Sequence, residues 1–230
     1  MKENEKYFIN GLFMAISIGY FIYLNTVGVP DDIIILMKYG GLYLDAFNKG
    51  EYWRLVVSMF MHVSMGHILC NMINQYLIGE RLERALGKIK FFIFYMICGI
   101  GANLVCMKLE MKEVAREAVK HMTISVGASG AICGLAGGLL YVTQANKGKY
   151  YGVTSYQVLL SVIFWVGFGL LSKNVNNDAH VSGFIIGYLL GVILYRRPKT
   201  LEDIERNQNM ELKLIEDSNE GSEDDWEDLK

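Results

Sequence analysis

Six stretches of this 230-residue chain contain no Asp, Glu, Lys or Arg. They cover residues 7–30, 55–79, 91–107, 121–146, 150–172 and 179–195, and are 24, 25, 17, 26, 23 and 17 residues long. A helix needs about 20 apolar residues to span the hydrocarbon core of a bilayer, with about 17 as the lower limit. The pattern therefore predicts an all-α, polytopic membrane protein and excludes the soluble enzyme classes.

We expect six transmembrane helices, at about residues 8–29, 62–79, 91–107, 124–145, 154–171 and 179–195. The first is interpreted as a retained span, since it is too long for the apolar core of a signal peptide. The loop after it is rich in aromatic residues and is expected to lie in the membrane interface. We expect a tight basic loop between the second and third spans, with Arg81, Arg84, Lys88 and Lys90, and a charged connector at residues 108–121.

The charges divide the chain into two parts. Residues 196–230 contain 6 Lys and Arg but 12 Asp and Glu, a net charge of −6, although the whole chain carries only −2. We therefore expect a membrane domain over residues 1–199 and an acidic, partly disordered cytoplasmic tail over residues 200–230. Basic residues near the span ends favour cytoplasmic termini in a plasma membrane. The chain has no basic patch that would indicate nucleic-acid binding.

Five polar residues are expected at a similar depth in the membrane. Spans 2, 4 and 6 must cross in the same direction, and the five residues lie near the starts of these spans: His62, His67, Asn71, Ser129 and His180. We expect Ser129 about five residues into its helix, roughly 7 Å below the helix start at about 1.5 Å per residue. Polar groups inside a membrane are costly, so this cluster is a candidate functional site.

The helical phase of the last span predicts close packing around this cluster. His180, Gly183, Gly187 and Gly191 fall on one stripe, because residues three and four apart share a helix face. On the fourth span, Ser129, Cys133 and Ala136 form another stripe beside Gly130 and Gly137. Small residues allow two membrane helices to approach closely. A serine hydroxyl would then come within reach of an imidazole.

A serine beside a histidine indicates acyl transfer. Serine becomes an effective nucleophile when a neighbouring base takes its proton, and His180 is the candidate base for Ser129. The developing oxyanion needs hydrogen-bond donors, and the Ser129 N–H, His67 and Asn71 are the candidates. Asp178 is expected to cap the helix of His180.

Two other classes of function remain as alternatives. Polar groups at one depth are also compatible with a small-solute transporter, although neither an inverted repeat nor a pair of broken spans is visible. A non-catalytic protein that binds membrane helices would share the same architecture. A zinc site is not expected, because His62 and His67 would lie about 140° apart on a helix and no HExxH motif occurs.

Several motifs together resemble the rhomboid family of intramembrane serine proteases. The first are Gly127-Ala128-Ser129-Gly130 and Ala179-His180-Val181-Ser182-Gly183, the latter followed by Gly187. The second span contributes His62, His67 and Asn71 in an HxxxxHxxxN pattern. Trp53-Arg54, Glu83 and Gly87 are similar to further family positions, so the resemblance covers about residues 50–195.

The resemblance implies a six-span helical bundle with a water-filled cavity open to the outer face. It implies a Ser129–His180 dyad that cleaves membrane-anchored protein substrates in or near their transmembrane segments, without a metal or cofactor. His67 and Asn71 would assist the oxyanion, with Gly127 in support and Gly183 and Gly187 as packing residues. Cys133 departs from members with an aromatic residue at this position, which leaves the support of His180 open.

Overall fold

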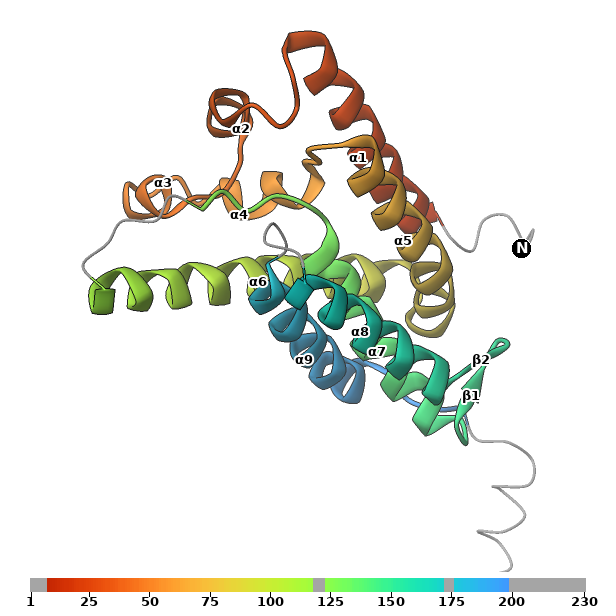
Figure 1. Cartoon of the computed structure of the whole chain (residues 1–230). Coiled ribbons are helices and arrows are strands. Elements are labelled where there is room, and N and C mark those ends of the chain that lie inside the picture. Colours follow the sequence, from red (N-terminus) through yellow and green to blue (C-terminus); the bar gives the residue numbers. More distant parts are fainter. Residues whose placement is uncertain (1–7, 118–122, 172–175, 199–230) are drawn as a thin grey trace, which may run out of the picture. The chain divides into compact units, whose positions relative to one another are not determined.

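The computed structural model describes residues 8–117, 123–171 and 176–198, which are folded mainly into helices (Figure 1). The longer helices are α1 (Phe8–Val27), α5 (Met65–Leu86), α6 (Lys88–Glu117), α7 (Ser129–Ala145), α8 (Ser155–Leu171) and α9 (Asn177–Leu194). The predicted helical fold is confirmed for these residues. The chain divides into two units, Met1–Tyr195 and Arg196–Lys230. His121 and the predicted tail at residues 200–230 lie outside the described residues.

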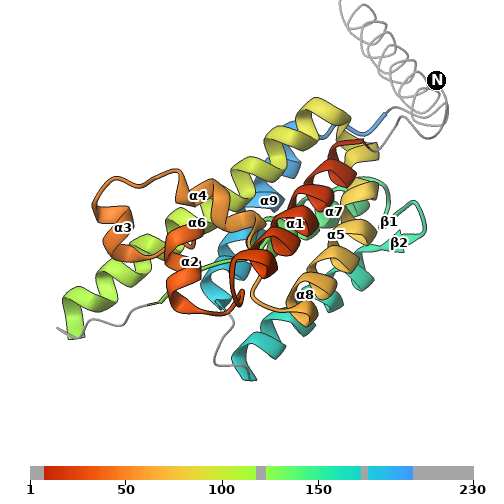
Figure 2. The same ribbon diagram turned by 90° about the horizontal axis from the view of Figure 1, so that it is seen from above.

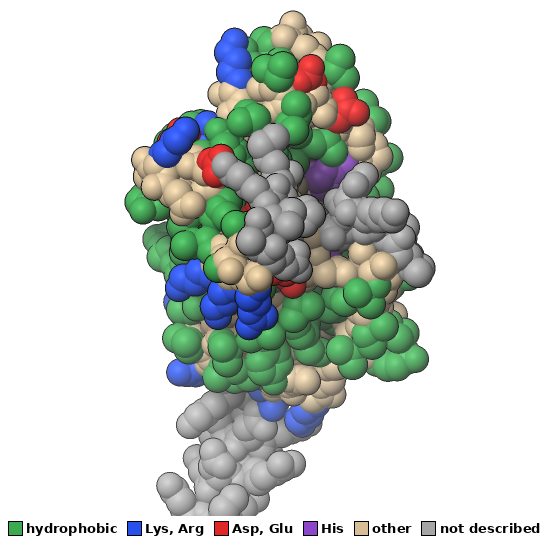
Figure 3. Space-filling view, turned by 60° about the vertical axis from the view of Figure 1, so that its left-hand side comes forward, with side chains coloured by type: hydrophobic (Ala, Val, Ile, Leu, Met, Phe, Trp, Pro, Cys, Tyr) green, Lys and Arg blue, Asp and Glu red, His purple; other side chains and the backbone are tan. Residues whose placement is uncertain are grey.

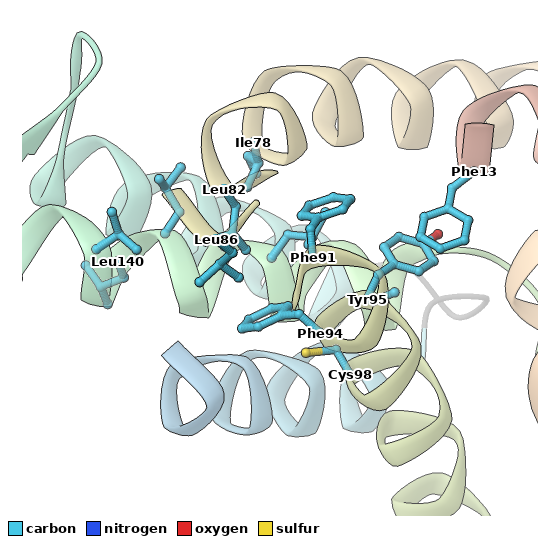
Figure 4. Packing of buried hydrophobic residues seen from close by; sticks show 14 of the residues in the cluster. Phe13, Ile78, Leu82, Leu86, Phe91, Phe94, Tyr95, Cys98 and Leu140 are labelled. Atoms are coloured by element: carbon cyan, nitrogen blue, oxygen red, sulfur yellow. The ribbon is translucent and has the colours of Figure 1, made fainter. Parts of the chain in front are cut away.

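Apolar side chains from five helices, α1, α5, α6, α7 and α8, form most of the main core of the first unit. Figure 4 shows Phe91, Phe94 and Tyr95 of α6 among aliphatic side chains of α5 and α7. Phe13 of α1 stacks on Tyr95, with ring centroids 4.3 Å apart. Many other large apolar side chains are exposed on the outer faces of the helices, and Figure 3 shows them over much of one face. Such a surface suits a lipid environment rather than water.

Three described helices are long and apolar enough to cross a membrane: α1, α6 and α9. A fourth span is reached if the chain from Arg54 to Phe60 is joined to α5, from which it is bent by 94°. Helices α7 and α8 have 17 residues each and are shorter than a typical span. Length and composition thus support three or four spans among the described residues, and the count of six stays a prediction.

The predicted basic loop between the second and third spans is wrong. Helix α5 continues to Leu86 and α6 begins at Lys88, so Gly87 alone, with a φ of +79°, separates them. Arg81 and Arg84 lie inside α5, where Arg84 forms an ion pair of 2.9 Å with Glu80 and Arg81 donates to the carbonyl of Tyr151 at 3.3 Å. Glu83 is 1% exposed and accepts hydrogen bonds from the backbone N–H groups of Ile9 (3.0 Å) and Asn10 (2.9 Å). A buried carboxylate therefore caps α1.

Two other connections are more ordered than expected. The charged connector is helical as far as Glu117, since α6 continues through it. The aromatic loop contains α2 (Ile33–Tyr39), α3 (Leu44–Asn48), α4 (Arg54–Val57) and the 3₁₀ turn η2 (Ser58–Phe60). Figures 1 and 2 show α3 and α4 beside α6, and each of these two short helices contacts α6. Tyr39, Tyr43 and Phe47 of this region are partly buried, whereas Tyr52 and Trp53 are exposed.

Arg54 holds this region together from a buried position. Its side chain is 7% exposed and donates hydrogen bonds to the carbonyl groups of Met37 (2.7 Å) and Gly41 (3.0 Å). It also forms an ion pair of 2.7 Å with Glu51 and lies 4.5 Å from the ring centre of Trp53. One guanidinium group thus joins the end of α2 to the start of α4.

We expect Arg54→Ala to lower the free energy of unfolding by about 3 kcal/mol, because two carbonyl groups and a carboxylate lose their donor. Thermal unfolding in detergent would measure the change. The matched variant is Arg116→Ala, whose side chain is exposed on α6 and whose loss should cost below about 1 kcal/mol. Equal melting temperatures for the two variants would contradict the role given to Arg54.

Helices α7 and α9 pack with their backbones in contact. Every residue of α7 from Gly130 to Leu140 is buried. A Cβ atom added to Gly183 would overlap the carbonyl oxygen of Gly130, and one added to Gly187 would overlap that of Gly134. The facing stripe of α7 therefore runs through the glycines, and the expected stripe of Ser129, Cys133 and Ala136 is displaced from it by one residue.

A short hairpin joins α7 to α8. Its strands β1 (Lys149–Tyr150) and β2 (Val153–Thr154) are antiparallel, with Lys149 opposite Thr154 and Tyr150 opposite Val153. The two turn residues, Tyr151 and Gly152, both have positive φ angles. This geometry matches the right-handed twist of two-residue hairpins.

Candidate active site

Ser129 is the first residue of α7, which corrects its predicted place about five residues inside a helix. Residues 124–128 do not continue the helix toward its N-terminus, and Ser125 instead forms an antiparallel bridge with Leu42. The N-cap residue is Ala128, whose side chain cannot accept a hydrogen bond from the first N–H groups of the helix. The first N–H groups of a helix have no partners within the helix. Ser129 therefore stands where backbone donors and the positive end of a helix dipole meet.

Gly127 explains why the helix does not start earlier. Its φ is +121°, a conformation that disfavours residues with a Cβ atom, and its N–H donates to the carbonyl of Ser58 at 2.9 Å. A Cβ atom added here would lie 2.9 Å from His67 Nε2 and 3.8 Å from Asn71 Nδ2. Gly127 thus turns the chain into α7 and brings two polar side chains of α5 close to that turn.

The two histidines of the second predicted span lie closer together than helical spacing suggests. His62 precedes α5, whose N-cap is Ser64, so its ring lies 5.0 Å from that of His67 in an edge-on arrangement. The expected 140° separation is wrong because it assumed one continuous helix. Among the described residues, no third His, Cys, Asp or Glu joins the pair as a possible metal-ligand set.

Buried hydrogen-bonding groups of this cluster lack partners among the described residues. Asn71 is 7% exposed, and its Nδ2 has no acceptor there. His62 is fully buried, with Nδ1 at 3.2 Å from the carbonyl oxygen of Phe60 and with Nε2 unpaired. Unpaired buried donors are unusual in folded proteins and call for an explanation. The free amide of Asn71 points to a site that accepts an external hydrogen-bond acceptor.

His180 is buried in the first turn of α9, and its Nδ1 also lacks a partner among the described residues. The cap of this helix is Asn176, whose side chain accepts a hydrogen bond from the N–H of Ala179 at 3.2 Å. The expected cap, Asp178, lies inside the first turn and is exposed. An N-cap residue accepts from the residue two or three positions later, which Asn176 alone does here.

The polar residues from the three helices are gathered at one end of the α5, α7 and α9 group. A Cβ atom added to Gly130 would lie 3.6 Å from the carbonyl oxygen of Ala179, so the residue after Ser129 lies close to the residue before His180. The structure records no hydrogen bond between Ser129 Oγ and His180.

The cluster is accessible from outside. Ser129 and His67 are both half-buried, and Figure 3 shows histidine side chains at the surface of one face. Cys133 lies one turn after Ser129 and is 2% exposed, so it belongs to the packed interior. A half-buried serine beside buried, unpaired donors is compatible with acyl transfer to a bound carbonyl group.

Sequence reasoning missed two residues that order this end of the bundle. Ser64 caps α5 by accepting a hydrogen bond from the N–H of His67 at 3.1 Å, and Asn176 caps α9. Both residue types are common N-caps, so the preference itself was a usable signal.

Comparisons with known proteins agree with the sequence motifs. A model of the rhomboid domain family matches residues 49–197. The chain is 27% identical to the rhomboid protease GluP of Bacillus subtilis, over 84% of this chain and 36% of that protein. It is 35% identical to RHOMBOID-like protein 4 of Arabidopsis thaliana, over 79% and 45% respectively. For the rhomboid protease AarA of Providencia stuartii the identity is 33%, over 72% and 64%.

The chain thus spans about a third to just under two thirds of the length of these curated relatives. The match to the family model begins before α4 and ends after α9, so it includes every residue of the candidate site.

Proposed function

Because the chain belongs to the rhomboid family, we propose that it is an intramembrane serine endopeptidase that cleaves membrane-anchored proteins in or near their transmembrane segments. One observation carries this proposal. The turn that contains Ser129 packs against the turn that contains His180, and the side chains of His67 and Asn71 lie beside the Gly127 turn that leads into it.

In the proposed reaction, His180 takes the proton of Ser129 as the serine oxygen attacks the substrate carbonyl carbon. The Ser129 N–H, His67 and Asn71 donate hydrogen bonds to the resulting oxyanion. His180 then gives the proton to the departing amine, which leaves an acyl ester on Ser129. Water hydrolyses this ester with His180 again as the base. No step requires a metal or cofactor.

Asn71→Ala is expected to lower kcat by about 10²-fold, the usual effect of removing one oxyanion donor. KM should change little, because the bond strengthens as charge develops. Steady-state cleavage of a fluorogenic membrane-anchored substrate would measure both constants. Asn74→Ala is the matched control, because the Asn74 amide donates to Cys70, one turn earlier in the same helix. A loss as large as that from replacing Ser129 would indicate a structural role for Asn71 instead.

The membrane arrangement is also part of the proposal. The protein is a multi-pass membrane protein of the rhomboid family. We propose six spans, with residues 1–199 in the protease domain and the acidic segment 200–230 in the cytoplasm of a plasma-membrane protein. Residues 124–128, which precede α7, are not helical. An extended residue covers about 3.3 Å, against about 1.5 Å for a helical one, so this segment and the 17 residues of α7 together support a span.

A serine-reactive fluorophosphonate probe tests the proposed function directly. Purified protein in detergent should be labelled at one serine, and mass spectrometry should locate the label on the peptide that contains Ser129. The same preparation should cleave a model membrane-anchored substrate at a defined site. A transporter or a non-catalytic helix-binding protein would show neither labelling nor cleavage, and that outcome would refute the proposal.

A further inference from the structure

We infer that Asn176 is a positioning residue, which aligns the turn of His180 with the chain segment that leads to Ser129. This inference rests on the proposed function. The side chain of Asn176 contacts three separate parts of the chain. Its Oδ1 accepts hydrogen bonds from the N–H of Ala179 (3.2 Å) and from the thiol of Cys106 (3.5 Å). Its Nδ2 donates to Ser125 Oγ at 3.3 Å.

Ser125 connects this side chain to the nucleophile. It lies in the segment before Ser129, four residues earlier, and pairs with Leu42 through two backbone hydrogen bonds of 2.7 and 3.1 Å. Two residues later, the N–H of Gly127 donates to the carbonyl of Ser58. The segment is therefore fixed on one side by the backbone of the α2 to η2 region. On its other side, Asn176 attaches it to α9.

The glycine contacts between α7 and α9 do not replace this connection. The tightest of them, between Gly183 and Gly130 and between Gly187 and Gly134, lie beyond the first turn of α9, which contains His180. Helix ends fray because their backbone groups lack internal partners. An error of about 1 Å in placing a catalytic group can cost about 10²-fold in rate. A side chain that joins this first turn to the Ser129 segment would therefore affect the rate.

An ordinary N-cap would explain only one of the three contacts. Serine is also a good N-cap, so Asn176→Ser should keep the hydrogen bond from Ala179. The shorter side chain cannot also reach Ser125. Asn176→Asp keeps both links, because the Ser125 hydroxyl can donate to a carboxylate as well as accept from an amide. These two variants separate capping from positioning.

The experiment compares four variants by steady-state cleavage of the membrane-anchored substrate: Asn176→Ser, Ser125→Ala, the double variant and Asn176→Asp. Each of the first two should lower kcat about 10-fold and leave KM within about twofold, in line with a modest misplacement of the base. The double variant should be no slower than either single one, because both remove the same bond. Asn176→Asp should recover activity to within about threefold of the parent. Asn25→Ser is the control, since the Asn25 amide bonds to Phe21 in its own helix.

Hydrogen exchange of the same variants provides a readout that does not depend on activity. Exchange at the amides of Ala179 and His180 should become faster in Ser125→Ala and stay close to the parent in Asn176→Asp. Parent-like kcat in Asn176→Ser or Ser125→Ala, or losses that multiply in the double variant, would overturn the inference. If the parent itself neither reacts with the probe nor cleaves, the proposed function fails, and unchanged exchange in Ser125→Ala would refute the connection as well.

Discussion

Replacing Ser129 by alanine is expected to lower kcat for cleavage by about 10⁴-fold or more, because Ser129 is the proposed nucleophile that forms the acyl intermediate. His180→Ala should cause a loss of similar size, since serine remains protonated without its base. The double variant should be no slower than the worse single variant, because residues that act as one unit lose their effect together. This non-additivity is the signature that separates a dyad from two independent binding residues.

Cleavage of a model substrate in proteoliposomes, followed over hours by mass spectrometry, has the dynamic range for this comparison. Ser182→Ala is a suitable control, because Ser182 also lies near a helix start but bonds to the carbonyl of Asp178 in its own helix. Substrate binding, measured by crosslinking, should be unchanged in all variants. If Ser129→Ala cleaved within tenfold of the parent, the assignment of the nucleophile would be wrong.

The positions of several helices could be predicted from charge alone. The first and last predicted spans, 8–29 and 179–195, agree with α1 and α9 to within two residues at each end. Charged or polar residues flank both helices, as is typical of membrane spans. The change from polar to apolar sequence therefore falls close to the helix ends. In the structure, His67 and Asn71 of α5 lie beside Gly127, just before α7, while the shared membrane depth of the polar residues stays a prediction.

The positions of charged residues gave wrong helix ends where charged residues lie inside a helix. The second predicted span ended at Gly79, yet α5 continues to Leu86. Glu83 lies inside this extension and is buried because it caps α1, a partner 73 residues away in the sequence. A single sequence does not reveal such a pairing, since it depends on how two helices approach each other.

Hydropathy also could not predict the local structure around Ser129. Residues 124–128 are as apolar as the helix that follows, and an apolar run has no periodicity that separates extended from helical chain. The positive φ of Gly127 and the bridge between Ser125 and Leu42 decide the outcome. As a result, Ser129 lies at a helix N-terminus rather than within a helix, which leaves its N–H free of intrahelical partners.

The second large effect is expected from Gly187→Ala, which should destabilise the protein by at least about 3 kcal/mol, the upper part of the usual range for overpacking. The added Cβ atom would lie 2.5 Å from the carbonyl carbon of Gly134 and 2.6 Å from its Cα. Both atoms belong to the backbone, so no side-chain rotation can relieve the clash. The two helices would have to separate along their whole contact.

A graded series makes this prediction specific to the α7–α9 interface. At Gly191 the added Cβ atom would be 3.2 Å from Gly138 Cα and from Tyr141 Cβ, a milder overlap. At Gly19 of α1 nothing lies within 4 Å, and alanine there should be neutral or stabilise the helix by up to about 1 kcal/mol. Melting temperatures in detergent should therefore decrease in the order Gly19→Ala, Gly191→Ala, Gly187→Ala.

Activity should follow the same order, because Gly187 lies two turns from His180 on the same stripe of α9. If Gly187→Ala failed to fold, Gly191→Ala would still report on the interface, and its melting temperature should lie below that of Gly19→Ala. Three variants with the same melting temperature would show that α7 and α9 do not touch through their backbones. In that case the close approach that brings the Ser129 and His180 turns together would lose its support.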